Sequence, residues 1–376
     1  MIERRFIAVE QPLLPALAEA LVATAPAAGR VDLRATAVVL PTSRACRRLR
    51  VALDRAADGR VLFAPVVCTP SMLLQQCVTP SRMIAPPLAE VLSWQRVLRQ
   101  ADDTTCCELM GISIYQHRTV TASERQSLAM RVQQVTAELA AACQTPADVS
   151  ATIARLHLPG DRDVWMSITA LQQAMREDLD TAGLQDADQA CAQAIAEGTV
   201  QLPGVTRLYS VAALPSPREQ AVLTALAASG VSVTAIVHGD ESLADHFHAD
   251  GSIKTDVWAS TSLDTSGAAH YSCETTEDQA AVVLEVIAGK GECDARDITL
   301  VTPDAATAAP MHRACAQEQV HLHVPEYTDA VHTSVGNAMV RLLSMLDAPT
   351  AQSWGTCCVI RCWQAMPLTM PLSCGT

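Results

Sequence analysis

The sequence predicts an α/β fold in which parallel β-strands alternate with helices. The clearest observation is residues 35–55, ATAVVLPTSRACRRLRVALDR, where a short apolar, β-rich run ends at Pro41 and an amphipathic helix follows at once. A buried strand that leads directly into a helix is half of a βαβ unit. The same alternation returns after residue 205. Hydrophobic residues make up 49% and charged residues 18% of the 376 residues, which is typical of globular chains with sizeable cores.

The first part of the chain is expected to hold three strands and three helices. Either Thr42 or Ser43 can act as the N-cap of the second helix, because a side-chain oxygen at that position accepts a free backbone N–H. Thr69 and Pro70 mark the start of the third helix. The expected elements are a strand at 6–9, a helix after Pro12, a strand at 35–40, a helix from about 43, a strand at 61–68 and a helix at 71–77.

Residues 86–198 change to an all-helical pattern. Leu88, Val91, Leu92 and Leu98 repeat at helical spacing, with Trp94 and Val97 beside them. Residues 121–124 read Thr-Ala-Ser-Glu, the pattern of a capping box, before a further apolar repeat at residues 128, 132, 135 and 139. A third helix is expected to carry Trp165, Ile168, Leu171, Met175 and Leu179. We interpret this segment as an insertion between strands of the first α/β unit.

The alternation that returns after residue 205 predicts the rest of the fold. Strands at 206–211 and 231–237 flank a helix at 217–229, and the polar stretch 239–267 is expected to be a loop or linker. A second α/β unit is expected to follow, with strands at 268–273, 298–301 and 320–324 and helices at 275–289, 304–318 and 335–346. The expected domains are a first α/β domain in two parts (1–85 and 199–266), the helical insertion (86–198), the start of a second α/β domain (267–348) and an aberrant tail (349–376).

Composition limits the classes of function. The net charge of −13 argues against a generally basic nucleic-acid-binding surface, so any DNA contact has to be local. No apolar stretch reaches membrane-spanning length and no secretory h-region is present, which predicts a cytoplasmic protein without a membrane partner. We expect most of the 14 cysteines to be reduced and buried.

The helix that begins near residue 43 is the best candidate binding element. Its start offers hydroxyls and free backbone N–H groups, and guanidinium groups follow within a turn, an arrangement that suits a phosphate. The alternative is a solvated basic helix face. The candidate contact residues are Thr42, Ser43, Arg44, Arg47 and Arg48, with Arg55 close to the same face.

No nucleotide-binding loop is present in the sequence. A P-loop needs glycines whose amides cradle phosphate and a lysine that reaches the β- and γ-phosphates. Lys254 and Lys290 are the only lysines; the first has no glycine loop before it, and Leu284 and Gly291 replace two required residues around the second. We therefore expect no ATP-driven motor in this chain and no bound cofactor.

Other candidate sites have simpler alternatives. Histidines and acids gather at residues 238–248 and could bind a metal, but a solvated loop is the favoured interpretation, because nothing in the stretch fixes the geometry of metal ligands. His321 and His323 share a face of an expected strand, and the tail carries Cys357, Cys358, Cys362 and Cys374 without CxxC pairs. No G-x-S-x-G nucleophile motif occurs. The carboxylate pairs are typical of solvated surface, so no residue is assigned a catalytic or metal-binding role.

Three segments together resemble the AddB-type subunits of bacterial helicase–nuclease complexes, often described as PD-(D/E)XK nuclease family proteins. AVVLPTSRACRRLRVAL resembles the family's strand and loop near motif Ia, which contacts DNA in superfamily 1 helicases. RLYSVAALPSPREQAVLTALAASGVSVTAIVHGDES resembles the Walker B and motif III region, with Ser210, Val211 and Ala212 in place of the acids and Gly239-Asp240 retained. ETTEDQAAVVLEVIAGKGECDARDITLVTPD resembles the opening of the second RecA-like domain, with Ala305, Ala306 and Thr307 where an arginine would be expected.

The resemblance covers about residues 5–350 and implies a pseudo-helicase. Two RecA-like domains would be retained for DNA binding and for docking a superfamily 1 helicase–nuclease partner, while ATP chemistry is lost. In the family, a nuclease domain, in some members with an iron–sulfur cluster, follows this region. The tail matches neither, and we expect it to be frame-shifted or truncated. The implied role is a non-catalytic scaffold in double-strand break repair and recombination that contacts the backbone of single-stranded DNA or duplex ends.

Two other classes of function stay open. One is a protein-interaction module of α/β type without a DNA role, which the acidic net charge favours. The other is an active nucleotide-dependent helicase, which the missing P-loop lysine disfavours.

Overall fold

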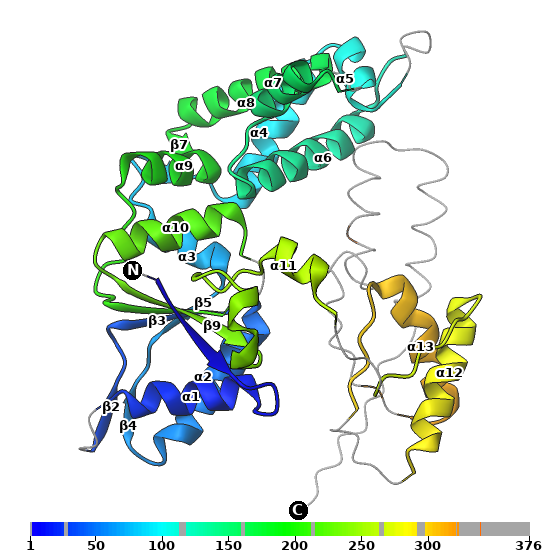
Figure 1. Cartoon of the computed structure of the whole chain (residues 1–376). Helices are drawn as coiled ribbons and strands as arrows, with labels where there is room; N and C mark the ends of the chain where they lie inside the picture. The colour runs from blue at the N-terminus through cyan, green and yellow to red at the C-terminus, as the bar shows by residue number, and fades with distance from the viewer. Residues whose placement is uncertain are drawn as a thin grey trace, which may run out of the picture. The chain divides into compact units, whose positions relative to one another are not determined.

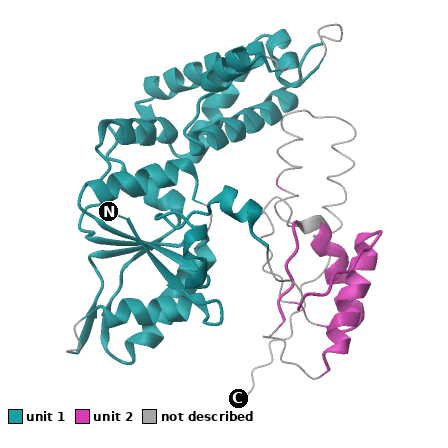
Figure 2. Cartoon of the chain, in the orientation of Figure 1, with its two compact units in different colours: residues 1–262 teal, residues 263–376 magenta. Residues whose placement is uncertain are grey.

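The computed structural model describes residues 2–25, 29–112, 118–158, 162–211, 215–262, 267–291, 298–320, 322 and 339. The chain divides into two compact units, residues 1–262 and residues 263–376, which Figure 2 shows in different colours. Unit 1 holds the sheet and most of the helices.

A five-stranded parallel sheet organises unit 1. Its strand order is β1-β9-β8-β3-β5, so strands from the beginning and the end of the unit lie in one sheet. Val38 of β3 pairs with Val67 of β5 on one side and with Tyr209 of β8 on the other. The α/β class with a parallel sheet is thus confirmed. The strands are β1 (Ile2–Ile7), β3 (Thr36–Val39), β5 (Val66–Cys68), β8 (Arg207–Ser210) and β9 (Ser232–His238).

Helices cover both faces of this sheet (Figure 1). On one face, α1 (Leu13–Ala23) and α2 (Ser43–Ala57) pack with Val38 in the first core. On the other, α3 (Pro70–Cys77), α9 (Ala187–Glu197) and α10 (Pro217–Ala228) pack with Val39 in the second core. Val38 and Val39 enter opposite cores because successive side chains of a strand point to opposite faces.

The expectation of one strand over 61–68 is wrong. β4 (Val61–Phe63) pairs with β2 (Arg30–Asp32) in a separate two-stranded sheet, while β5 joins the central sheet. Pro65 lies between the two strands. Proline has no backbone N–H to donate to a strand partner, and this favours a break in the pairing at that position.

The described residues between 87 and 197 form the helical region, which lies between β5 and β8 in the chain. Trp94 is 2% exposed and packs in its core with Leu98, Leu128 and Leu171. The capping box at Thr121 and Glu124 is confirmed, with both reciprocal hydrogen bonds present. The helices are α4 (Pro87–Gln100), α5 (Asp103–Leu109), α6 (Ala122–Ala141), α7 (Pro146–Leu156), α8 (Arg162–Thr181) and α9, with β6 (Met83–Ile84) paired to β7 (Leu184–Gln185).

The buried face of α4 differs from the expected one. Leu88 and Leu92 are 68% and 43% exposed, whereas Trp94, Val97 and Leu98 are buried. The difference follows from the position of α8, to which Ser93 of α4 donates hydrogen bonds, at the Met175 carbonyl and the Asp178 carboxylate. In the described part of the chain, no helix has the length and apolarity needed to cross a lipid bilayer.

The polar stretch after β9 is not simply a loop or linker. It forms η2 (Glu241–His246) and α11 (Thr255–Ser260) and packs on the edge of the sheet. Arg4 of β1 donates hydrogen bonds to the carbonyls of Phe247 and His248, and the ring of Phe247 meets that of Phe6 edge-on at 5.9 Å. This segment covers the outer part of the sheet, beside β1.

Unit 2 contains two of the expected helices. α12 (Thr276–Gly289) and α13 (Ala305–Gln317) are confirmed, and Arg313 of α13 lies 3.6 Å from Glu277 of α12. Residues 268–273 and 298–301 are described and carry no strand, contrary to expectation. The expected strand at 320–324 and the helix at 335–346 fall almost entirely outside the described residues, as does the tail from 349.

The described cysteines are free thiols, and most are buried as expected. Cys143 is exposed and Cys273 is partly exposed. Burial raises the pKa of the Cys68 thiol to about 11 and that of Cys77 to about 12, which keeps both as unreactive thiols at neutral pH. The buried cysteines are Cys46, Cys68, Cys77, Cys106, Cys107, Cys191 and Cys315.

Gly251 allows the segment after β9 to approach the sheet. Its φ is +80°, and a Cβ at this position would lie 3.1 Å from Cβ of Ala235. We expect Gly251→Ala to lower the free energy of unfolding, which urea denaturation measures. Backbone strain alone accounts for about 1–2 kcal/mol of this loss. The close contact with Cβ of Ala235 adds to it. Gly198→Ala is the matched control, because Gly198 has a φ of +66° and open space around it. Equal losses in the two variants would contradict the close approach.

Candidate functional site

The direction in which the sheet is wound reverses between β3 and β8. The helix after β3 packs on one face and the helix after β8 packs on the other. In doubly wound sheets, ligands bind outside the carboxyl ends of two such strands. In this sheet, residues 40–42 follow the carboxyl end of β3, and residues 211 and 215–216 follow that of β8.

Two capped helix N-termini face this part of the molecule. Thr42 is the N-cap of α2, and its hydroxyl accepts a hydrogen bond from the Ala45 amide at 3.1 Å. Ser216 caps α10 in a capping box with Glu219. Of the two N-caps that the sequence allowed for α2, Thr42 is therefore the one used, and its side-chain oxygen already serves the helix. Ser43 is the first residue of α2 and is exposed.

The predicted arginines do not all lie together. Arg47 and Arg48 line a groove of about 760 Å³ between α1 and α2, and Arg55 joins them about two turns further on. Thr42, Ser43 and Arg44 are not among the residues that line it. The predicted contact residues thus lie in two places. Thr42, Ser43 and Arg44 lie at the start of α2, and Arg47 and Arg48 lie on the groove wall. The other lining residues are Pro12, Leu13, Leu14, Pro15, Glu19, Val51, Ala52 and Ala56.

Helical geometry explains why α2 presents its arginines on one face. Residues 44, 48, 51 and 55 follow one another at three- or four-residue steps, so they share one face of α2, with Arg47 beside it. The opposite face carries Cys46, Leu49 and Leu53 into the core. Because the apolar face of α2 is held against the core, its arginine face points outward and forms the basic wall of the groove.

Arg50 belongs to the fold and not to the groove. Its Nη2 donates a hydrogen bond of 2.8 Å to the carbonyl of Val67 in β5. Arg50 lies two residues from Arg48, which already places it off the groove face. The partner carbonyl is distant in the sequence, so only the structure shows the role of this arginine.

The β1–α1 turn contains no phosphate-binding loop. Its residues 8–12 read AVEQP, the Gln11 amide donates to the Ala8 carbonyl at 3.0 Å, and Pro12 is the N-cap of α1. Without glycines or a lysine, this turn cannot cradle phosphates in the way that a P-loop does.

The histidines and acids after β9 have separate partners. His238 Nε2 lies 3.1 Å from the Gln11 carbonyl, and His246 Nε2 lies 3.0 Å from the Thr261 hydroxyl. Asp240 caps η2 and accepts the Ser242 amide, which lowers the pKa of its carboxyl. Across the residues that the structure describes, no three potential metal ligands come together. His321, His323 and the four tail cysteines lie outside those residues.

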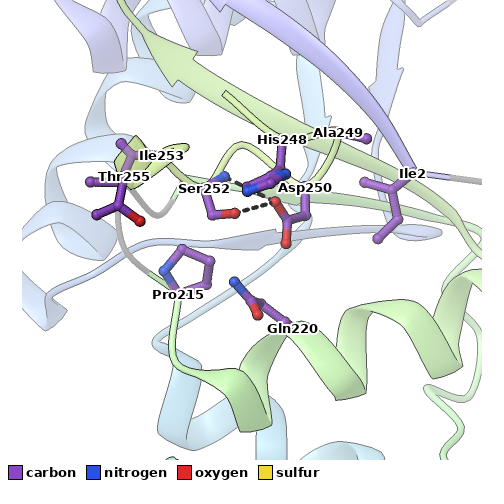
Figure 3. Close-up of a pocket in the computed structure, with 9 residues that line it drawn as sticks. All are labelled: Ile2, Pro215, Gln220, His248, Ala249, Asp250, Ser252, Ile253 and Thr255. Carbon is purple, nitrogen blue, oxygen red and sulfur yellow. Dashed lines mark hydrogen bonds between the residues drawn. The ribbon is translucent and has the colours of Figure 1, made fainter. Parts of the chain in front are cut away.

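A second pocket, of about 680 Å³, lies between α10, the start of β1 and residues 248–255 (Figure 3). His248, Asp250 and Ser252 meet there, with Gln220 below them. Ser252 Oγ donates to Asp250 at 2.6 Å, so the serine is bonded to the acid and not to the imidazole base that would activate it. Sequence reasoning missed this pocket, because its walls come from three distant segments.

No protein-family model matches this chain, and a search of the curated proteins found no match either.

The capping role of Thr42 can be separated from any binding role. We expect Thr42→Ala to lower the free energy of unfolding by about 1 kcal/mol, because one amide of the first turn of α2 loses its acceptor. Chemical denaturation followed by circular dichroism measures this change. Ser43→Ala is the control and is expected to stay within about 0.5 kcal/mol of the unsubstituted protein. A larger loss at Ser43 than at Thr42 would contradict the assignment of the cap.

Proposed function

We propose that this chain is a non-catalytic, helicase-like subunit portion that binds the DNA backbone and docks a motor subunit in double-strand break repair and recombination. The observation that carries the proposal is the groove between α1 and α2, which presents Arg47, Arg48 and Arg55 on a chain of net charge −13. Such a local concentration of guanidinium groups suits phosphates. In this proposal, the sheet of unit 1 is a RecA-like domain with the helical region inserted, and unit 2 begins a second one.

The groove can follow a nucleic-acid strand for part of its length. From Arg47 to Arg55, the groove wall on α2 rises about 12 Å, at 1.5 Å per residue. Arginines along this length would contact successive phosphates, and Ser43 would add a hydroxyl at the helix start. Backbone contacts of this kind give salt-dependent affinity with little preference for base sequence.

The proposal assigns ATP chemistry to the partner. The β1–α1 turn of this chain lacks the glycines and the lysine of a P-loop. A superfamily 1 helicase–nuclease partner would supply the motor, and this chain would hold the DNA next to it.

Apolar side chains in the same groove favour a second candidate function, that of a protein-interaction module. Val51 is 53% exposed and lies on the groove wall with Leu13 and Leu14 opposite. Exposed apolar side chains surrounded by charged ones are typical of docking surfaces. The occupant in this case would be an acidic, amphipathic segment of a partner protein.

Charge reversal in the groove tests the first candidate. We expect Arg47→Glu with Arg48→Glu to weaken single-stranded DNA binding at low salt and to reduce the slope of log affinity against log salt by roughly 1.4, from two contacts at about 0.7 each. Fluorescence anisotropy with a labelled oligonucleotide measures both quantities.

The matched control is Arg99→Glu with Arg131→Glu, which changes the net charge equally at two exposed positions in the helical region. Thermal unfolding of each variant checks that the fold is retained. An equal loss of affinity in both double variants would mean that net charge, and not the groove, governs binding. Unchanged affinity in the groove variant would refute the proposal.

Val51 separates DNA binding from protein docking. We expect Val51→Lys to strengthen DNA binding, because it adds a cation between Arg48 and Arg55, and to weaken an apolar protein contact at the same position. Anisotropy with DNA and pull-down of the candidate motor subunit give the two readings. Weaker DNA binding of Val51→Lys, together with unchanged pull-down of the motor subunit, would contradict both expectations.

A further inference from the structure

The pocket of about 680 Å³ in Figure 3 has no role in the proposed contact with DNA. It lies between the start of α10, the start of β1 and a turn at residues 247–253. Its volume is in the range of small-molecule sites, which combine apolar walls with a few converging polar groups. We call it the turn pocket; its polar side chains are Gln220, His248, Asp250, Ser252 and Thr255.

Contacts within the turn and with the sheet hold the turn in place. The His248 amide donates to the Ser252 carbonyl at 2.7 Å. Arg4 of β1 donates to the His248 carbonyl at 3.1 Å, and Gly251 lies against Ala235 of β9. A ligand that binds the turn therefore does not have to order it first, which lowers the entropic cost of binding.

Asp250 presents a carboxylate that is anchored through one oxygen and open at the other. Its Oδ1 accepts hydrogen bonds from the Ser252 amide at 3.0 Å and from the Ser252 hydroxyl at 2.6 Å. Ser252 is 7% exposed, so this anchor is buried. No described residue donates a hydrogen bond to Oδ2, and Figure 3 shows the carboxylate and the Gln220 amide pointing toward each other across the pocket.

The charge of Asp250 selects for a cation. Among the described residues that line the turn pocket, there is no second acid, and there is no lysine or arginine to neutralise this one. A carboxylate in this position attracts a positively charged ligand.

The other polar groups select for a primary ammonium. Gln220 Oε1, the Thr255 hydroxyl and a ring nitrogen of neutral His248 are acceptors, and none of them is hydrogen-bonded to another described residue. An ammonium group has three N–H donors for these acceptors and the carboxylate. Quaternary ammonium ligands are instead bound by aromatic cages, and no Phe, Tyr or Trp is found in the described lining.

The apolar part of the lining suits an alkyl stem. It includes Ile2 of β1, Pro215 before α10 and Ile253 of the turn. A methylene chain lies along such side chains while its charged end keeps its hydrogen bonds, as the stem of a lysine does.

We propose that the turn pocket binds a primary alkylammonium ion, whose ammonium group donates to Asp250 and Gln220 and whose stem lies against Ile2 and Ile253. A free alkylamine and the lysine side chain of a partner protein share this chemistry. The proposal does not depend on DNA binding in the groove between α1 and α2.

Two matched cations test the chemistry of the ligand. n-Butylammonium and n-butyltrimethylammonium carry the same charge and the same stem, but only the first has N–H donors. We expect the full-length protein to bind n-butylammonium at least about tenfold more tightly, because hydrogen bonds to charged groups are lost in the second. Amide chemical shifts followed by NMR during titration at physiological ionic strength measure both affinities. Equal affinity for the two cations would overturn the proposal.

Substitution of Asp250 tests the position of the site. We expect Asp250→Asn to weaken n-butylammonium binding at least about tenfold, because the amide removes the charge and keeps an acceptor for Ser252. Asp245→Asn makes the same change in net charge at an exposed residue outside the turn pocket, and is expected to leave the affinity unchanged. Unchanged affinity in Asp250→Asn, or an equal loss in Asp245→Asn, would overturn the proposal.

Gln220→Leu gives a reading that does not alter the turn, because Gln220 belongs to α10. We expect weaker n-butylammonium binding in this variant, with thermal unfolding as the check that the fold is retained. If Asp250→Asn does not fold, unchanged affinity in Gln220→Leu would overturn the proposal.

The source of the ammonium is distinguished by comparing n-butylammonium with lysine whose α-amino and carboxyl groups are blocked as amides. Blocked lysine that binds at least as tightly supports the lysine side chain of a partner protein. Binding of n-butylammonium together with exclusion of blocked lysine supports a free amine. Neither ligand contains nucleic acid, so failure of this proposal and failure of the DNA-binding proposal are distinguishable.

Discussion

Burial of strand β3 on both of its faces is the constraint on which the rest of unit 1 depends. All four of its residues are buried, and Thr36, Ala37 and Val38 have no exposed surface at all. A parallel strand in this position needs a helical layer on each side. The chain therefore has to supply α1 and α2 on one face and then cross to supply α3, α9 and α10 on the other. The long helical region lies in the chain between α3 and α10, which both pack on that second face.

The same constraint produces the candidate site. Because Leu49 and Leu53 must enter the core beneath β3, the arginine face of α2 turns outward beside α1. The two helices then form a groove whose wall is basic and whose floor is partly apolar. The composition of the groove thus results from the amphipathic pattern of one helix, and its depth results from packing against a second helix.

The sequence predicted the features that depend only on residues close together in the chain. The strand before Pro41, the N-cap at residue 42 or 43, the capping box at Thr121 and the buried stripe of α8 depend on neighbouring residues, and the structure confirms them. The arginine face of α2 was also readable, because helical periodicity alone places residues 44, 48, 51 and 55 together.

Features that depend on distant partners could not be predicted. The break at Pro65 depends on long-range pairing, because β4 before it pairs with β2 and β5 after it joins the central sheet. The segment after β9 is polar in composition, yet Arg4 and Phe6 of the first strand hold it on the sheet. The role of Arg50 follows from its hydrogen bond to the Val67 carbonyl, a contact that no local pattern encodes.

Photo-crosslinking tests the central claim most directly. A single-stranded oligonucleotide that carries 4-thiothymidine would be crosslinked to the protein at low salt, and the attached peptides would be identified by mass spectrometry. The account predicts crosslinks within residues 12–19 and 43–56, the two walls of the groove, which disappear as salt is raised. Crosslinks concentrated in the helical region, or none above the background of an unrelated acidic protein, would contradict it.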